Sequence, residues 1–302
     1  SKLTVHAEAL STQAQRIVVE FELAGSSAGY IATLCAQCVR AQGRYAAALQ
    51  GCERAESLLA ERNPARVPVA RLHLAQVWLD LGQHARALQV LDGAALATAR
   101  TLPARYAVRW LVLLARVRRR LGPRQGEAIA ALLAEAAALV PGDGWPELGL
   151  IVGTEQALDL EPQTALDRLG CVAQQARQGQ LHGAELGAQL HLARLAATVD
   201  PAAARQAARA ALHLAQTTEA LHTDRAWRWL APAIALSTPG ASPAETAQAA
   251  QWAQAGQQWL RATAAAQMAP EFTDSFLHQH PVNQALLAWW PVTPGAGSVT
   301  GP

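Results

Sequence analysis

A small side chain returns about every forty residues along this chain, and this spacing restricts the possible folds more than any other feature. The stretch from Cys35 to Ala55 shares its pattern of small and glycine positions with the stretch from Leu74 to Ala94, 39 residues later. A period between 20 and 50 residues indicates a repeat architecture, in which each unit buries its apolar face against its neighbours. The small position continues through the chain as Ala36, Ala75, Ala115, Gly153, Ala193 and Ala233.

Composition indicates that the repeated unit is helical. Of the 302 residues 51% are hydrophobic but only 5% are aromatic, because Ala and Leu supply most of the apolar content. Both residues favour helices over strands. The sequence therefore predicts an all-α protein.

The two clearest copies resemble the tetratricopeptide repeat family. Ala36, Gly43 and Ala48 return as the equivalent residues 39 positions later. In that family one small residue lets two helices approach, a glycine turns the chain, and a second small residue receives the first helix. Gly122 keeps the turn in the third copy and Gly240 restores it in the sixth, whereas the fourth and fifth copies depart from the pattern. The resemblance implies a right-handed α–α superhelix, or solenoid, of about six helix pairs with terminal capping helices.

The long period narrows the resemblance further. A repeat near 40 residues exceeds the usual unit of about 34 residues. It resembles the tetratricopeptide regions of large bacterial ATPase-linked transcriptional regulators, of the maltose-activator and antibiotic-regulatory types. The segment from Glu271 to Leu287 resembles the piece that closes the array in those proteins. The resemblance implies an interaction or sensor module for signal transduction and transcription regulation. Because the chain starts at Ser1 and its only methionine is Met268, we expect a fragment of a larger protein.

These patterns predict four segments: an N-terminal capping helix over 1–28, a repeat array over 29–268, a C-terminal cap over 269–290 and a disordered tail over 291–302. Ser242 and Glu245 form a capping box, which predicts the start of a helix. Asp200 and Glu161 each precede a proline, so we expect second helices to begin there.

Charge and hydropathy argue against two classes of partner, nucleic acid and membranes. The net charge is only +2 and Lys2 is the only lysine, so a globally basic nucleic-acid binder is not indicated. The longest apolar stretch is broken by Arg109 and Arg116, so we expect no membrane partner. No signal peptide is recognisable at the start, which predicts a cytoplasmic location.

Catalytic motifs do not occur. With one lysine there is no candidate for a P-loop or Schiff-base lysine in the array, and G-x-S-x-G is absent. We therefore expect no enzyme activity and no cofactor. A catalytic alternative would use Glu155 and Asp159 with His182 and His191, and it requires a pocket in which carboxylates converge.

The cysteines and histidines do not predict a metal site. Cys35 and Cys38 form a C-x-x-C, a spacing that can bind metal or form a redox pair. Cys35 and Cys52 occupy positions that are leucine in the next copy, so we expect them to be buried core residues. The nine histidines show no metal-ligand spacing.

The third copy carries an unusual charge pattern. No acidic residue lies between Asp92 and Glu127, whereas eight arginines do. The first helix of each pair lines the concave surface in the tetratricopeptide family, and positions spaced three and four apart share one helix face. The resemblance therefore implies a groove whose polar wall consists of Gln37, Arg40, Gln76, Arg109, Arg116 and Arg119.

Arginine forks bind carboxylate and phosphate groups, so this groove suits a protein or peptide partner, including an acidic one. A small-molecule effector is compatible with the same groove. Nucleic acid or a phosphorylated small molecule, bound through the arginine-rich third repeat, is the alternative. A solvated basic face without a ligand also accounts for the pattern.

Overall fold

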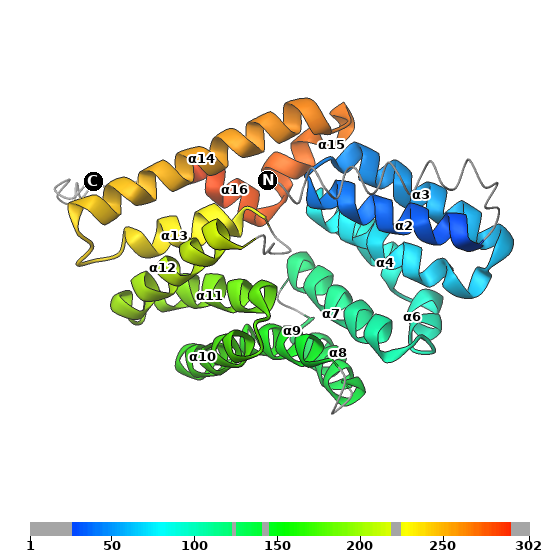
Figure 1. Cartoon of the computed structure of the whole chain (residues 1–302), viewed down its shortest axis with the longest axis horizontal. Coiled ribbons are helices and arrows are strands. Elements are labelled where there is room, and N and C mark those ends of the chain that lie inside the picture. The colour runs from blue at the N-terminus through cyan, green and yellow to red at the C-terminus, as the bar shows by residue number, and fades with distance from the viewer. Residues whose placement is uncertain (1–25, 123–124, 141–144, 219–224, 291–302) are drawn as a thin grey trace.

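The computed structural model describes residues 26–122, 125–140, 145–218 and 225–290, and within these ranges helices are the only regular elements (Figure 1). The prediction of an all-α superhelix is confirmed. The predicted tail lies outside the described residues, as does the predicted capping helix except for 26–28, which belong to the first helix of the array.

Six helix pairs form the array, and two short helices, η1 (Pro64–Arg66) and α6 (Ala94–Ala99), lie in the connections. The pairs are α2 (Ser26–Ala41) with α3 (Tyr45–Arg62), α4 (Val67–Asp80) with α5 (His84–Leu91), α7 (Ala104–Leu121) with α8 (Gly126–Leu139), α9 (Pro146–Ala157) with α10 (Pro162–Gln178), α11 (His182–Ala196) with α12 (Pro201–Thr217), and α13 (Trp227–Leu236) with α14 (Pro243–Gln267). Each first helix contacts the first helix of the next pair, so these helices form one continuous inner layer.

The six recurring small residues all lie in helix-to-helix contacts. The five alanines are at most 2% exposed, and Gly153 is buried as well. A Cβ atom added at Gly153 would lie 3.4 Å from Val172 on the partner helix α10. A larger side chain at these positions would hold the two helices of a pair apart, which is why the spacing of small residues predicts the pairing.

Local chemistry sets the helix boundaries as expected. Ser242 accepts from the backbone N–H of Glu245 while the Glu245 carboxylate accepts from the Ser242 backbone, which completes the predicted capping box at the start of α14. Asp200 accepts from two backbone N–H groups at the start of α12, and α10 begins at Pro162. Because the caps of α12 and α14 satisfy amides that the helix itself leaves unpaired, they fix where these two second helices begin.

The two ends of the described array meet. Three short elements follow α14: α15 (Pro270–Asp274), the π-helix η3 (Ser275–Gln279) and α16 (Pro281–Ala288). α15 and η3 contact the first two pairs, whereas α16 packs against α13 and α14 (Figure 1). Phe276 packs against Tyr45 with ring centroids 5.7 Å apart, and the Ser275 hydroxyl donates to the Leu81 carbonyl over 2.8 Å. The superhelix is therefore closed into a ring by contacts that the repeat pattern does not predict.

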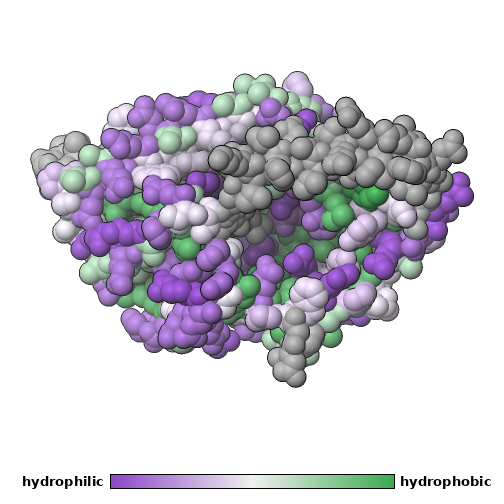
Figure 2. All heavy atoms as spheres, in the orientation of Figure 1, coloured by the Kyte–Doolittle hydropathy of each residue, from purple (hydrophilic) through white to green (hydrophobic). Residues whose placement is uncertain are grey.

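One apolar cluster joins α2 to α9 with α13, α14 and α16, whereas α10, α11 and α12 pack in separate apolar clusters. On the face seen in Figure 2 the coloured hydrophobic residues lie between hydrophilic ones and do not form one large patch. None of the described helices is long and apolar enough to cross a membrane.

Candidate functional site: a polar pocket on the inner layer

A pocket of about 330 Å³ opens on the inner layer, lined by the first helices of five consecutive pairs: α2, α4, α7, α9 and α11. Five of the six predicted groove residues line it, from three different helices. They are Gln37, Arg40, Gln76, Arg109 and Arg116. The sixth, Arg119, lies one helical turn beyond Arg116 on the same face of α7.

The α2–α4 side of the pocket is a network of paired polar groups. Arg40 donates to the carboxylate of Asp80 over 2.7 Å, and Gln76 donates to the other oxygen of the same carboxylate over 3.0 Å. Burial disfavours the charge of Arg40, but Asp80 outweighs that effect and raises the pKa of Arg40. The charge of Arg40 is thus held inside the protein and is already balanced.

Gln37 and His73 form the other polar pair on this side, with the amide nitrogen 2.9 Å from Nε2 of the ring. Burial, together with the positive charges of Arg40 and Arg109, lowers the pKa of His73 to about 3. His73 is therefore neutral near pH 7 and presents an uncharged ring to the pocket.

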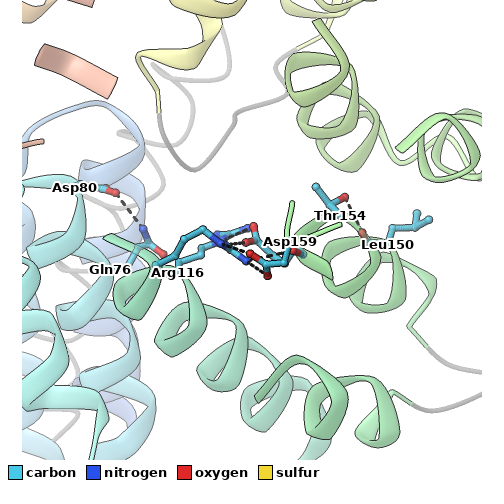
Figure 3. Close-up of polar contacts among 8 residues, drawn as sticks. Gln76, Asp80, Arg116, Leu150, Thr154 and Asp159 are labelled. Atoms are coloured by element: carbon cyan, nitrogen blue, oxygen red, sulfur yellow. Dashed lines mark hydrogen bonds and ion pairs between the residues drawn. The ribbon is translucent and has the colours of Figure 1, made fainter. Parts of the chain in front are cut away.

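The α7–α9 side contains a buried carboxylate shared by two arginines. Arg116 donates to Glu155 over 2.8 Å, and Arg119 donates to Glu155 over 2.7 Å and to Asp159 over 2.8 Å. In Figure 3 Arg116 reaches from α7 toward the C-terminal end of α9, and Asp159 lies in the turn that follows this helix. Burial raises the pKa of Glu155, but the positive charges of Arg116 and Arg119 outweigh that effect and lower it to about 2.

The three arginines predicted to face the groove from one helix, Arg109, Arg116 and Arg119, therefore do not form one open anion site. Arg116 and Arg119 form ion pairs with Glu155, and Arg119 forms another with Asp159. These pairs join α7 to α9 within the inner layer. Arg109 is exposed and makes no hydrogen bond or ion pair with any residue that the structure describes. Glu147, on α9, is likewise exposed and lines the same pocket without a described bond. Among the described residues, one cation and one anion at the pocket thus remain without an ion pair.

The groove arginines were not paired with their acidic partners from the sequence, and the wall of the pocket that α9 and α11 form was not predicted. A sequence signal for the ion pairs exists. Arg40 and Asp80 are 40 residues apart, Arg116 and Glu155 are 39 apart, and Arg119 and Asp159 are 40 apart. These separations equal the repeat period, so an arginine and an acid one period apart face each other across neighbouring first helices. His73 and Thr154 also line the pocket and were not predicted, whereas His191 lines it and was named only for the catalytic alternative.

The cysteines behave as predicted where the structure tests them. Cys35 and Cys52 are 6% and 1% exposed, and burial raises the pKa of the Cys52 thiol to about 12. Both therefore pack as small apolar residues. The described part of the chain contains no cluster of three or more His, Cys, Asp or Glu residues suited to a metal ion.

Two solved structures resemble this ring. A Rap protein in complex with Competence and Sporulation Factor aligns with a TM-score of 0.63 at 13% identity, over 90% of this chain and 79% of that chain. The Rap conjugation gene regulator of plasmid pLS20, in complex with the Phr* peptide, aligns with a TM-score of 0.56 at 11% identity, over 85% of this chain and 72% of that chain. The fold is similar to that of Rap proteins.

At these identities the likeness concerns the fold alone. Rap proteins are helical solenoids of tetratricopeptide repeats, so the coarse resemblance stated from the sequence is supported. No protein-family model matches this sequence, and no curated protein matches it either. The narrower resemblance to ATPase-linked regulators stays a prediction.

Proposed function

We propose that this chain is the sensor module of a bacterial regulatory protein with transcriptional output, and that it binds a peptide in the inner pocket without catalysing a reaction. The observation that carries the proposal is the pocket itself, which first helices from five consecutive pairs line together. The two solved structures reported above are complexes of Rap proteins with a factor or a peptide. A cytoplasmic location stays a prediction from the sequence.

The free groups of the pocket favour a ligand that carries both charges. Arg109 and Glu147 leave one positive and one negative group unpaired among the described residues, while the floor between them is neutralised by internal pairs. A peptide offers a carboxylate, an amine and backbone amides together. A volume of about 330 Å³ is at the small end of the range of about 300–1,000 Å³ for ligand pockets, so only a short segment fits inside.

The same geometry argues against the two alternatives. Nucleic-acid binding through the third repeat needs cations free to meet phosphates, whereas Arg116 and Arg119 already pair with Glu155. Catalysis by Glu155 needs a carboxyl group that can exchange protons near pH 7, whereas its pKa lies at about 2. Both groups hold the structure together instead.

A ligand in this pocket bridges several pairs, and regulation follows from that. Each pair of a solenoid contacts mainly its neighbours, so small rotations between pairs add along the array. A peptide that contacts α2 and α11 at once stabilises one curvature of the ring over others, and any attached domain experiences the change.

Gly183 offers a direct test, because it lines the pocket and an added Cβ atom there would meet nothing within 4 Å. Gly183→Leu should therefore fill the pocket without disturbing the fold. Gly170→Leu is the matched control, since Gly170 lies on α10 outside the pocket and is equally unobstructed. Short synthetic peptides are selected on the wild type from a random pool, and their Kd is measured on all three proteins.

We expect Gly183→Leu to weaken binding by about tenfold or more and Gly170→Leu to leave it unchanged. Equal affinity of Gly183→Leu and wild type would show that peptides bind elsewhere. A wild type that selects no peptide at all would refute the proposed function.

A further inference from the structure

Arg194 on α11 is an arginine for which the described structure supplies no bonding partner. The side chain is half-buried, and its Nε atom is buried without a hydrogen-bond acceptor in the described part of the chain. The guanidinium lies 5.1 Å from the centroid of the Trp227 ring, which holds it in place from one side. Burying such a group without a hydrogen bond is costly, so a partner from outside the chain would gain from completing it.

The position of Arg194 makes it a continuation of the pocket. Ala184, Gly187 and His191 line the pocket from α11, and Arg194 follows at the next helical spacing on the same face. On α7 the same step leads from Arg116 to Arg119. Arg194 therefore lies one helical turn beyond the pocket, on the wall of the same groove.

The neighbours of Arg194 are basic. Burial and the positive charges of Arg120 and Arg119 lower the pKa of Arg194. Asp159, which pairs with Arg119, already accepts two hydrogen bonds from it. The electrostatic environment thus attracts an anion.

Comparison between pairs shows why no acid on the described neighbouring helix pairs with Arg194. Arg194 follows Ala193 as Arg116 follows Ala115, so the two arginines are equivalent in the repeat. The partner of Arg116 is Glu155, two residues after the small residue of the next pair. At the equivalent place after Ala233 stands Ala235, which is fully buried and has no charge.

We propose that Arg194 is an anion-binding subsite of the groove, in which its guanidinium takes a carboxylate of the bound peptide with Trp227 as the stacking support. The planar fork of arginine matches a carboxylate through two parallel hydrogen bonds. The carboxylate comes either from the peptide C-terminus or from an Asp or Glu side chain. The identity of the ligand as a peptide rests on the proposed function, whereas the anion site does not.

The test uses the peptides selected by the wild-type protein. Each is made in three forms: the free acid, the C-terminal amide, and the form with Asp and Glu replaced by Asn and Gln. Their Kd is measured on wild type, on Arg194→Gln, and on Arg261→Gln as control, because Arg261 is exposed on α14 and makes no described bond. Circular dichroism confirms that each variant is folded.

We expect wild type and Arg261→Gln to prefer one carboxylate form over its neutral counterpart by about 10- to 100-fold, the factor typical of a hydrogen bond to a charged group. Arg194→Gln should lose this preference while binding the neutral form as wild type does. The form that matters identifies the C-terminus or a side chain as the source. An unchanged preference in Arg194→Gln would overturn the proposal.

If no peptide binds, the proposed function fails and the anion site is tested alone. Thermal unfolding is followed in phosphate and in chloride at one ionic strength. A rise in Tm with phosphate that wild type and Arg261→Gln show and Arg194→Gln lacks supports the subsite. The same response from all three proteins, or from none, contradicts it.

Discussion

The shared carboxylate of Glu155 gives the sharpest quantitative prediction. Its two oxygens accept from Arg116 and Arg119, and its side chain is only 4% exposed. Glu155→Gln keeps the shape of the side chain but removes the negative charge. Two half-buried arginines then lose their common partner, and Arg119 retains only Asp159 among its described ion pairs.

The size of the effect follows from the pKa of Glu155, which is lowered from 4.5 to about 2. One pKa unit corresponds to about 1.4 kcal/mol, so the lowering amounts to about 3 kcal/mol of folding free energy near pH 7. Removing one partner of a buried pair costs about 3–5 kcal/mol in other proteins, which is consistent with this figure. We therefore expect Glu155→Gln to lower the free energy of unfolding by about 3 kcal/mol.

Urea unfolding followed by circular dichroism measures this loss, and Glu135→Gln is the matched control. Glu135 also accepts two hydrogen bonds from an arginine, Arg100, but its side chain is 32% exposed and that of Arg100 is 49% exposed. Solvent screens such a pair, so the control should lose at most about 1 kcal/mol. Equal losses for both variants would refute the argument that burial makes the Glu155 pair strong.

The pH dependence gives a second check on the same residue. A carboxylate whose pKa is lowered on folding stabilises the protein above its unfolded pKa, near 4.5, and loses that contribution as the pH falls toward about 2. The stability difference between wild type and Glu155→Gln should therefore be constant between pH 7 and pH 5 and shrink below that. A difference that stays the same down to pH 3 would contradict the assignment.

Three further substitutions test the ring closure and a helix cap. Gly82 has a φ of +75° and an added Cβ atom would lie 2.4 Å from the Ser275 carbonyl oxygen, whereas Gly93 has a φ of +64° and nothing within 4 Å. Urea unfolding should show that Gly93→Ala costs about 1–2 kcal/mol for the left-handed backbone and that Gly82→Ala costs clearly more, with faster hydrogen exchange in α16. Equal costs would mean that the ring closure contributes no stability. Ser242→Ala removes the capping box of α14 and should cost about 1 kcal/mol in the same assay, with no loss expected if the cap were unimportant.

The sequence predicts helix pairing and helix starts best, because residues close together in the chain determine both. Small residues at one spacing mark close helix contacts, and Ser242 or Asp200 marks a helix start within a few residues. The closure of the ring has no such local cause. It depends on Ser275 reaching Leu81, 194 residues away, and on Phe276 meeting Tyr45, so the identity of these residues alone cannot reveal the contact.

Only the wall of the pocket formed by α2, α4 and α7 was predicted from the sequence, because groove-facing positions were assigned in the first three pairs alone. Those positions lie six and three residues before the small residue and one and four after it. Continued to the later pairs, the same register gives Glu147 and Thr154 on α9 and Gly187 on α11, which the structure places in the pocket. The repeat therefore contained this information, and the departures of the middle copies from the glycine pattern did not change it.

The same register also explains which arginines are free to meet a ligand. An arginine one or four residues after a small position is neutralised when an acid follows 39 or 40 residues later, as Asp80 follows Arg40. Arg109 and Glu147 lie before their small positions and 38 residues apart, and the described structure shows no bond between them. After Arg194 the corresponding residues, 39 to 41 positions on, are Ala233, Ile234 and Ala235. The spacing thus separates arginines that join neighbouring helices from Arg194, for which the described residues supply no acid. Applied to other helical repeat arrays, this rule predicts which groove arginines form ion pairs between neighbouring helices and which can bind an anionic ligand.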